Sequence, residues 1–200
     1  SAMILQYYSR VYGRRQPELL TNEGDITRML TDIWQQVNRE FPTESTLKEL
    51  RTAITYIKNM ALADEEIEGL ETDLANLPEL YRRYQAALKR AGQMDYDDQM
   101  VFALQILGAA PPVLAYFQQR YKYFCVDESQ DTSKIQHEII RLLAGRSLNL
   151  FMVGDEDQSI YGFRAAYPQA LMDFEKTYPG AQILLMEQNY RSTEPILEAA

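Results

Sequence analysis

The sequence is short of the residues that build disulfide frameworks and metal sites. Its 200 residues include one cysteine, Cys125, and one histidine, His137. A single cysteine excludes a disulfide within the chain, and the two side chains together are too few for a structural zinc site, which takes four ligands. Eight prolines and nine glycines are also too few for a collagen-like or disordered chain.

Long apolar runs and a basic surface are missing as well. No stretch of about eighteen apolar residues occurs, which excludes a transmembrane helix, and no basic-then-apolar secretory signal opens the chain. The net charge is −9, and the acidity is spread evenly over both halves. This charge argues against a free-standing nucleic-acid-binding domain, which usually shows a basic stripe. It is compatible with a cytoplasmic bacterial protein.

The first half of the chain has the apolar periodicity of α-helices. Residues 1–3 resemble a tag remnant and are left out of the fold prediction. Thr43 or Ser45 is expected as the N-cap of the second helix, and Asp95 as the N-cap of the fourth. The pattern predicts helices over about 22–41, 43–61, 78–91 and 95–107, then a break at 108–112 and a short helix through 113–117.

The periodicity changes after residue 120. Short β-branched and aromatic runs predict buried strands, with Cys125 as a small buried residue of the first. Strands alternating with helices indicate an α/β fold with a parallel sheet and crossover helices. We therefore expect a helical subdomain over 4–115 and an α/β part over 116–200. The strands are expected at 121–126, 148–153 and 183–186, and the helices at 135–143, around 170–174 and from about 193.

Polar residues follow each predicted strand, in the segments 127–131, 154–164 and 187–193. Ligands bind beyond the carboxyl ends of parallel strands, so these segments are expected along one rim. There Asp127 could hold Mg²⁺ beside a nucleotide triphosphate, and Glu128 could orient or deprotonate an attacking water.

Other side chains of this rim suit a nucleotide or a nucleic acid. Gln158 could sense the γ-phosphate, Arg191 could neutralise charge on a transferred phosphoryl group, and Tyr190 offers a flat face for a base. Taken singly, each feature has an ordinary explanation as a solvated loop, a helix cap, a core aromatic or a surface ion pair. On the same grounds the carboxylates of 95–98 are interpreted as helix-start residues, and His137 as a helix-surface residue without a role.

Together the motifs resemble those of a known family. Residues 126–132 (VDESQDT), 153–166 (VGDEDQSIYGFRAA) and 187–193 (EQNYRST) resemble helicase motifs II, III and IV. They occur in the order and at the spacing of the UvrD/Rep/PcrA-type superfamily 1 DNA helicases. Residues 95–98 (DYDD) resemble the segment before motif II, and the helical part resembles the inserted helical subdomain of that family more loosely. The resemblance implies a partial RecA-like motor domain.

The resemblance also implies a role for each motif residue. Asp127 would bind Mg²⁺ and Glu128 would be the catalytic base. Gln158 would couple the γ-phosphate to the DNA site. Tyr190 would stack on the adenine of ATP, and Arg191 would contact its γ-phosphate.

A second set of residues is implied to contact single-stranded DNA. These are Tyr161, Phe163 and Arg164, whose aromatic faces and charge suit stacking and a phosphate contact. Two positions depart from the family pattern. Ser129 stands where an aromatic residue is common, and Ala165 stands where glycine is usual.

The phosphate-binding loop of nucleotide triphosphatases, Gly-x-x-x-x-Gly-Lys-[Ser/Thr], does not occur in the sequence. We therefore expect an internal piece of a longer helicase that uses ATP and Mg²⁺ and acts on single-stranded or partly duplex DNA. The expected direction is 3′→5′, the expected partners are the remaining parts of the same polypeptide, and the piece alone is expected to be inactive. Two alternatives stay open: a non-enzymatic helicase-like interaction module, and the motor part of a helicase–nuclease.

Overall fold

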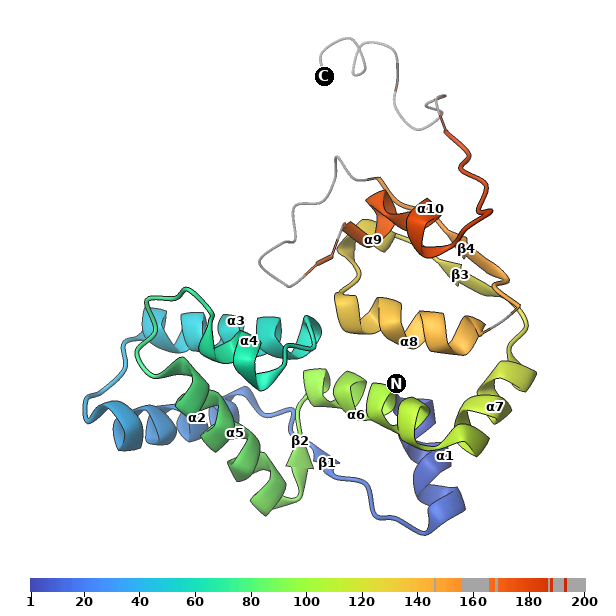
Figure 1. Cartoon of the computed structure of the whole chain (residues 1–200). Helices are drawn as coiled ribbons and strands as arrows, with labels where there is room; N and C mark the ends of the chain where they lie inside the picture. The colour runs from blue at the N-terminus through green and yellow to red at the C-terminus, as the bar shows by residue number, and fades with distance from the viewer. Residues whose placement is uncertain (146, 156–165, 168, 187, 189–192, 194–200) are drawn as a thin grey trace.

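The computed structural model describes residues 1–145, 147–155, 166–167, 169–186, 188 and 193. It is a mixed, mostly helical structure with two small parallel sheets (Figure 1). In chain order the elements are α1 (Ala2–Tyr12), β1 (Glu18–Leu19), α2 (Glu23–Asn38), α3 (Glu44–Asn59), α4 (Asp64–Glu68), α5 (Leu77–Ala91), β2 (Gln93–Met94), α6 (Tyr96–Ala109), α7 (Pro111–Arg120), β3 (Phe124–Val126), η1 (Ser129–Asp131), α8 (Lys134–Ala144), β4 (Leu150–Met152), α9 (Gln169–Met172) and α10 (Phe174–Thr177).

Local capping signals define most helix ends. The Asn22 side chain accepts hydrogen bonds from the backbone N–H groups of Gly24 and Asp25 in the first turn of α2. Thr43, rather than Ser45, caps α3 by accepting from the Thr46 N–H. Gly92 ends α5 with φ of 65°, a left-handed conformation that favours glycine. The predicted helices of this part are confirmed, although α2 ends at Asn38, three residues before the expected end.

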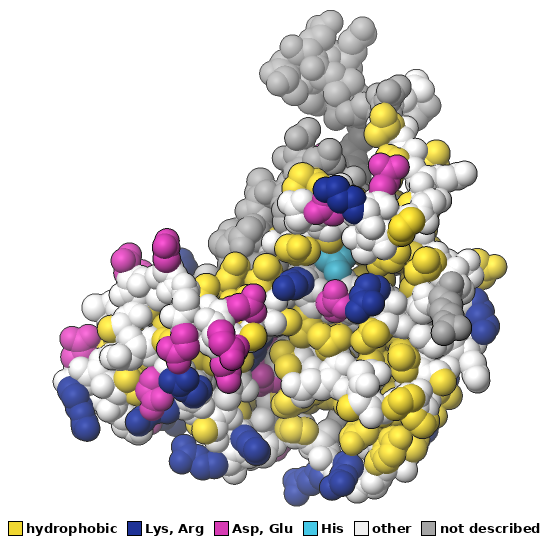
Figure 2. Space-filling view, viewed as in Figure 1, with side chains coloured by type: hydrophobic (Ala, Val, Ile, Leu, Met, Phe, Trp, Pro, Cys, Tyr) yellow, Lys and Arg dark blue, Asp and Glu magenta, His cyan; other side chains and the backbone are white. Residues whose placement is uncertain are grey.

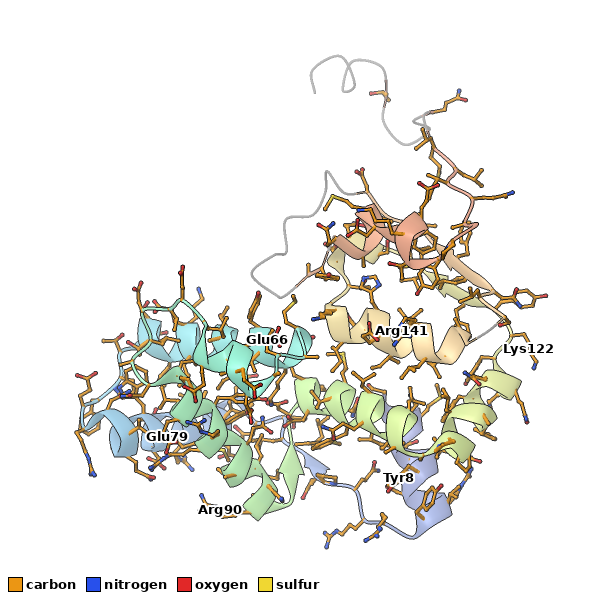
Figure 3. All side chains as sticks on the ribbon, in the orientation of Figure 1. Tyr8, Glu66, Glu79, Arg90, Lys122 and Arg141 are labelled. Carbon is orange, nitrogen blue, oxygen red and sulfur yellow. The ribbon has the colours of Figure 1, made fainter. Side chains whose placement is uncertain are left out.

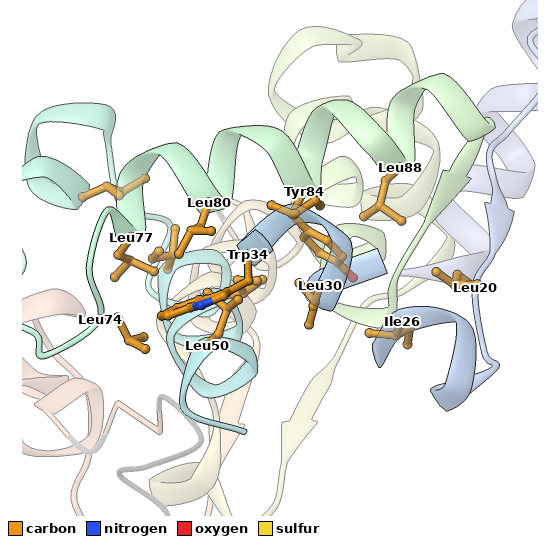
Figure 4. Packing of buried hydrophobic residues seen from close by; sticks show 14 residues of the cluster. Leu20, Ile26, Leu30, Trp34, Leu50, Leu74, Leu77, Leu80, Tyr84 and Leu88 are labelled. Carbon is orange, nitrogen blue, oxygen red and sulfur yellow. The ribbon is translucent and has the colours of Figure 1, made fainter. Parts of the chain in front are cut away.

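The first hydrophobic core lies between α2, α3, α4 and α5 (Figure 4). Trp34 of α2 lies among leucines from the neighbouring helices, and Leu50 and Leu80 are completely buried. This packing explains the apolar stripe of each helix, because the stripes face one another. The core consists of Leu20, Ile26, Leu30, Ile33, Trp34, Leu50, Ile54, Ile57, Ile67, Leu74, Leu77, Leu80, Tyr84 and Leu88.

The second hydrophobic core joins α1, α6, α7 and α8, and α1 was not predicted. Ile4 and Leu5 of α1 are buried in it, and the Tyr7 ring stacks on Tyr116 of α7 at a centroid distance of 3.9 Å. In Figure 2 hydrophobic side chains gather over α1 and α7, whereas acidic ones gather over α3–α5. The core consists of Ile4, Leu5, Met94, Ala103, Leu107, Ala110, Val113, Phe117, Ile135 and Ile139.

The predicted break between α6 and α7 is confirmed at Ala110. Both helices contribute to the second core, with Ala103, Leu107 and Val113 at 0–1% exposure. Within the described residues, no helix by itself has the length and apolarity of a membrane span. By length and composition alone, α6 and α7 pass that test only as a pair bent by 102°.

Two short parallel strand pairs complete the fold. β1 pairs with β2, and both are too short to be apparent in a periodicity. β3 pairs with β4 in parallel, with Phe124 opposite Leu150, and α8 connects them, which confirms the predicted crossover. Lys122 lies where the chain passes from α7 to β3 (Figure 3), and its carbonyl accepts a 3.0 Å hydrogen bond from the Asn149 side chain.

Three strand predictions need correction. β3 and β4 have three residues each and are not buried, since Cys125 is exposed and Phe151 is 59% exposed. Residues 183–186 form no strand, and their side chains are 52–88% exposed. Their apolarity suits a strand, but a strand also needs a neighbouring edge with which to pair. The expected helix near 170–174 is divided into α9 and α10, and the helix expected after 193 lies outside the described residues.

Candidate functional site

The carboxyl ends of β3 and β4 lie side by side. Val126 is opposite Met152 in the register, and the Val153 N–H donates to the Val126 carbonyl at 2.8 Å. Asp127 and Glu128 follow β3 directly, and Gly154 and Asp155 follow β4 by one residue. The structure therefore brings the beginnings of two of the three predicted polar segments to one edge.

Glu128 has an unusual backbone at this edge. Its φ is 49° and its ψ is 45°, in the left-handed region, which costs about 1–2 kcal/mol for a residue with a Cβ. The Glu128 N–H donates to the Asp127 carboxylate at 3.0 Å, and both side chains are exposed. Such strain persists only where the surroundings hold the residue, and it clusters at functional sites.

Gln130 connects the two polar segments. Its side-chain Nε2 donates to Oε2 of Glu128 at 2.7 Å, and its Oε1 accepts from the backbone N–H of Asp155 at 3.0 Å. The residue is 1% exposed. A buried amide thus holds a surface carboxylate next to the backbone of Asp155, which follows β4.

Ser129 and Gly154 pack tightly beneath this connection. Ser129 is completely buried, and its N–H donates to the Val153 carbonyl at 2.9 Å. A Cβ on Gly154 would lie 2.5 Å from Oγ of Ser129 and 2.8 Å from Oε1 of Gln130. Only glycine fits at this position, because the neighbouring groups are buried.

His137 of α8 lies behind the same segment and is half-buried, not on the open surface of its helix. Its Nε2 is 2.6 Å from Oγ1 of Thr132, whose hydroxyl donates to the Ser129 carbonyl at 2.7 Å. Burial lowers the pKa of His137 below its ordinary value, so the imidazole is neutral at pH 7. The histidine is a structural support of the turn that follows Glu128.

The other predicted site residues lie outside the described residues. The structure accordingly places Asp127 and Glu128 together and does not describe the side chains predicted to contact the nucleotide or DNA. The residues concerned are Gln158, Tyr161, Phe163, Arg164, Tyr190 and Arg191.

The described donors fit an Mg²⁺–nucleotide in part. Among the described residues, no group of three or more His, Cys, Asp or Glu side chains could hold a metal ion. Mg²⁺ in nucleotide sites, however, is commonly held by one or two carboxylates together with phosphate oxygens and water. The exposed carboxylate of Asp127 can supply such a ligand, whereas the phosphate cradle is absent from the sequence.

A buried ion cluster between α3 and α6 was missed by the sequence prediction. Lys58 is 2% exposed, and its Nζ lies 2.5 Å from Oδ2 of Asp95 and 2.7 Å from Oδ1 of Asp98. The Tyr84 hydroxyl donates to Oδ2 of Asp95 at 3.1 Å. Burial is the main reason why the pKa of Asp98 is raised.

The carboxylates of 95–98 therefore do more than start a helix. Asp95 is the N-cap of α6 and forms a capping box with Asp98, as expected for helix-start residues. Asp97 in addition accepts hydrogen bonds from Thr55 and Asn59 of α3. One signal for this cluster was present in the sequence. Residues 50, 54 and 58 are four positions apart and lie on one helix face, so Lys58 continues the buried face of Leu50 and Ile54.

Comparison with known proteins matches residues 1–179 to the UvrD/REP helicase N-terminal domain. An ATP-dependent DNA helicase PcrA of Leuconostoc citreum is 51% identical over 122 residues, which cover 61% of this chain and 16% of that protein. The protein of the same name from Staphylococcus aureus (strain Mu50) is 42% identical over 150 residues, 74% of this chain and 20% of that protein. The chain thus spans about a fifth of the length of these curated relatives.

Proposed function

The chain belongs to the UvrD/REP helicase N-terminal domain family, and we propose that it is an internal part of a longer ATP-dependent DNA helicase. The names of the relatives, ATP-dependent DNA helicase PcrA, support this proposal. The proposal includes a helical subdomain over 4–115 and the carboxyl half of a RecA-like motor domain over 116–200. It also includes a cytoplasmic location, where DNA is accessible.

One observation carries the proposal. Asp127 and Glu128 follow the end of β3 beside the residues that follow β4. The Gln130 side chain donates to Glu128 and accepts from the backbone N–H of Asp155. An exposed carboxylate pair at the carboxyl edge of a parallel sheet is suited to water attack on a phosphoryl group. In the proposed mechanism Asp127 supplies an oxygen ligand for Mg²⁺, and Glu128 accepts the proton of the attacking water.

The remaining roles rest on the motifs alone. Gln158 would transmit the presence of the γ-phosphate to the DNA site. Tyr190 would hold the adenine by stacking, and Arg191 would stabilise negative charge on the phosphoryl group. Bound ATP and Mg²⁺ would supply the phosphoryl group and charge neutralisation, and the phosphate loop would come from another part of the longer protein.

Single-stranded DNA is the proposed polymer substrate, with movement in the 3′→5′ direction. Tyr161 and Phe163 would stack on bases, and Arg164 would contact a phosphate. The net charge of −9 offers little general attraction to DNA. The 200-residue chain is therefore expected to bind single-stranded DNA weakly and in a salt-sensitive way.

The test is ATP hydrolysis by the longer protein that contains this chain, with and without single-stranded DNA. We expect DNA-stimulated hydrolysis, and Glu128→Gln is expected to lower kcat by about 10²- to 10⁴-fold with folding intact, because it removes the general base. The isolated 200-residue chain is expected to hydrolyse no ATP. Glu138→Gln on α8 is the matched control, since Glu138 bonds only to Arg141 among the contacts described.

Three outcomes would contradict the proposal in whole or in part. A longer protein that binds DNA but hydrolyses no ATP would favour the non-enzymatic module instead. Hydrolysis by the isolated chain, lost in Glu128→Gln, would mean that a complete site forms without a phosphate loop. Unwinding of duplexes with a 5′ tail but not a 3′ tail would overturn the proposed direction alone.

A further inference from the structure

Gln130 occupies a position from which it can transmit movement. Its side chain is the direct connection between a carboxylate oxygen of Glu128 and the backbone N–H of Asp155. Residue 155 begins the polar segment 155–164 that follows β4 in the sequence. The two bonded groups therefore follow different strands of the sheet and belong to different motifs.

The surroundings leave this side chain little freedom. Gln130 is 1% exposed and Ser129 is completely buried. Gly154 approaches both so closely that an added Cβ would lie within 2.8 Å of either side chain. Since packed interiors are not continuously deformable, a displacement of the backbone at Asp155 has to move the amide group or break its bond.

The opposite end of the connection is a strained residue. Glu128 is held at φ of 49°, where most residues with a Cβ are disfavoured. Its carboxylate is exposed, and Gln130 donates to it at 2.7 Å. Among the described residues, the direction of the carboxylate is thus determined by the backbone of residue 128 and by the Gln130 amide.

We propose that Gln130 is a positioning residue that aligns the Glu128 carboxylate only while the backbone at Asp155 is in place. The proposal rests on the proposed function, in which Glu128 is the general base. A displacement of the backbone at Asp155 then changes catalysis through Gln130, without any contact between Gln130 and the nucleotide. The amide is a direct physical link between the two motifs.

The chemistry of the side chain explains why glutamine is suited to this role. A glutamine amide donates and accepts at the same time. An ionised glutamate at the same position would accept from the Asp155 N–H but repel Glu128, and an alanine would make neither bond. Gln130→Glu therefore removes the bond to Glu128 and keeps the bond from the Asp155 N–H, whereas Gln130→Ala removes both bonds.

Steady-state ATP hydrolysis by the longer protein is the first readout. Both variants are expected to lower the DNA-stimulated kcat by about tenfold to a hundredfold, as expected for a misplaced base, with KM for ATP within about threefold. Gln130→Glu is expected to recover activity relative to Gln130→Ala as the pH falls, because the introduced carboxyl group donates again when protonated. Gln136→Glu, which preserves the capping box of α8, is the matched control and keeps wild-type activity.

The second readout is hydrogen exchange of the Asp155 backbone amide in the same protein. It is followed by mass spectrometry of peptides that end near residue 155. It requires no catalysis. Gln130→Ala is expected to raise the exchange rate by about fivefold or more, the effect of losing one hydrogen bond. Gln130→Glu is expected to retain protection, since its carboxylate still accepts this bond.

The two readouts separate the possible failures. Unchanged exchange in Gln130→Ala, or a kcat within twofold of wild type in both variants, overturns the positioning role. A wild-type protein without ATP hydrolysis but with the expected exchange pattern overturns the proposed function and leaves the mechanical link standing. A loss of kcat in Gln130→Glu that does not change with pH also counts against the positioning role.

Discussion

At the scale of single residues, the site depends on a few positions whose backbone or packing is restrictive. Glu128 adopts a left-handed backbone conformation that the neighbouring sequence does not predict. Gly154 lies against Ser129 and Gln130. Glycine is required there because a side chain would collide with these two residues, and not because of the backbone conformation. Asp127 and Glu128 were predicted from their place after a strand, but the bond from Gln130 became apparent only in three dimensions.

The backbone of Glu128 leads to a stability prediction. Because φ is positive, Glu128→Gly is expected to be about 1 kcal/mol more stable to unfolding than Glu128→Ala, while both variants abolish ATP hydrolysis by the longer protein. Urea denaturation of the 200-residue chain measures the difference. At Glu138 within α8 the order is expected to reverse, since glycine destabilises a helix interior relative to alanine by about 1 kcal/mol. The same order at both positions would contradict the strain at residue 128.

At the scale of elements, the helices α3 and α6 are joined by a buried ion cluster. One lysine, Lys58, faces two carboxylates, Asp95 and Asp98, and the Gln85 amide also donates to Asp98 at 3.3 Å. Buried ion pairs are costly to break because the remaining charge is left unpaired. The cluster connects an element of the first hydrophobic core to an element of the second.

The raised pKa of Asp98 predicts a pH dependence of stability. The folded protein binds a proton at Asp98 more tightly than the unfolded chain does, so the stabilisation is complete below the ordinary pKa of about 4. It is lost as the pH rises through the raised pKa. The free energy of unfolding of the wild type, relative to that of Asp98→Asn, is therefore expected to fall as the pH rises above about 4.

Denaturant unfolding of both proteins at several pH values checks this expectation. Glu65→Gln, at an exposed position of α4, serves as the control and should follow the wild type. A wild type that gains stability over Asp98→Asn as the pH rises would show the opposite sign and would contradict the raised pKa.

At the scale of the whole molecule, the two cores account for helices α1 to α8, while the sheet of β3 and β4 has an open face. Cys125, Phe151 and Tyr123 are exposed there. Parallel sheets are generally covered on both faces. We therefore expect other parts of the longer protein to cover this face, in agreement with the proposed RecA-like domain.

Alkylation of Cys125 tests this expectation. The thiol should react quickly in the 200-residue chain, where it is exposed, and about tenfold more slowly in the longer protein, where it would be covered. The rate at Cys125 is followed by mass spectrometry of its peptide. Both proteins should react equally fast in denaturant, which is the control. Equal rates in the native proteins would mean that the face stays open.

Features that depend on neighbouring residues along the chain were predictable from the sequence. Helix periodicity and the Asp95 cap are local, and so is the alternation that predicted a parallel pair joined by α8. Which apolar runs pair with another segment became clear only from the three-dimensional fold. In that fold 183–186 is not a strand and Lys58 is buried between two carboxylates. The fold also decided that Gln130 bonds to Glu128 and to Asp155, because pairing, burial and hydrogen bonding depend on distant segments that no local pattern records.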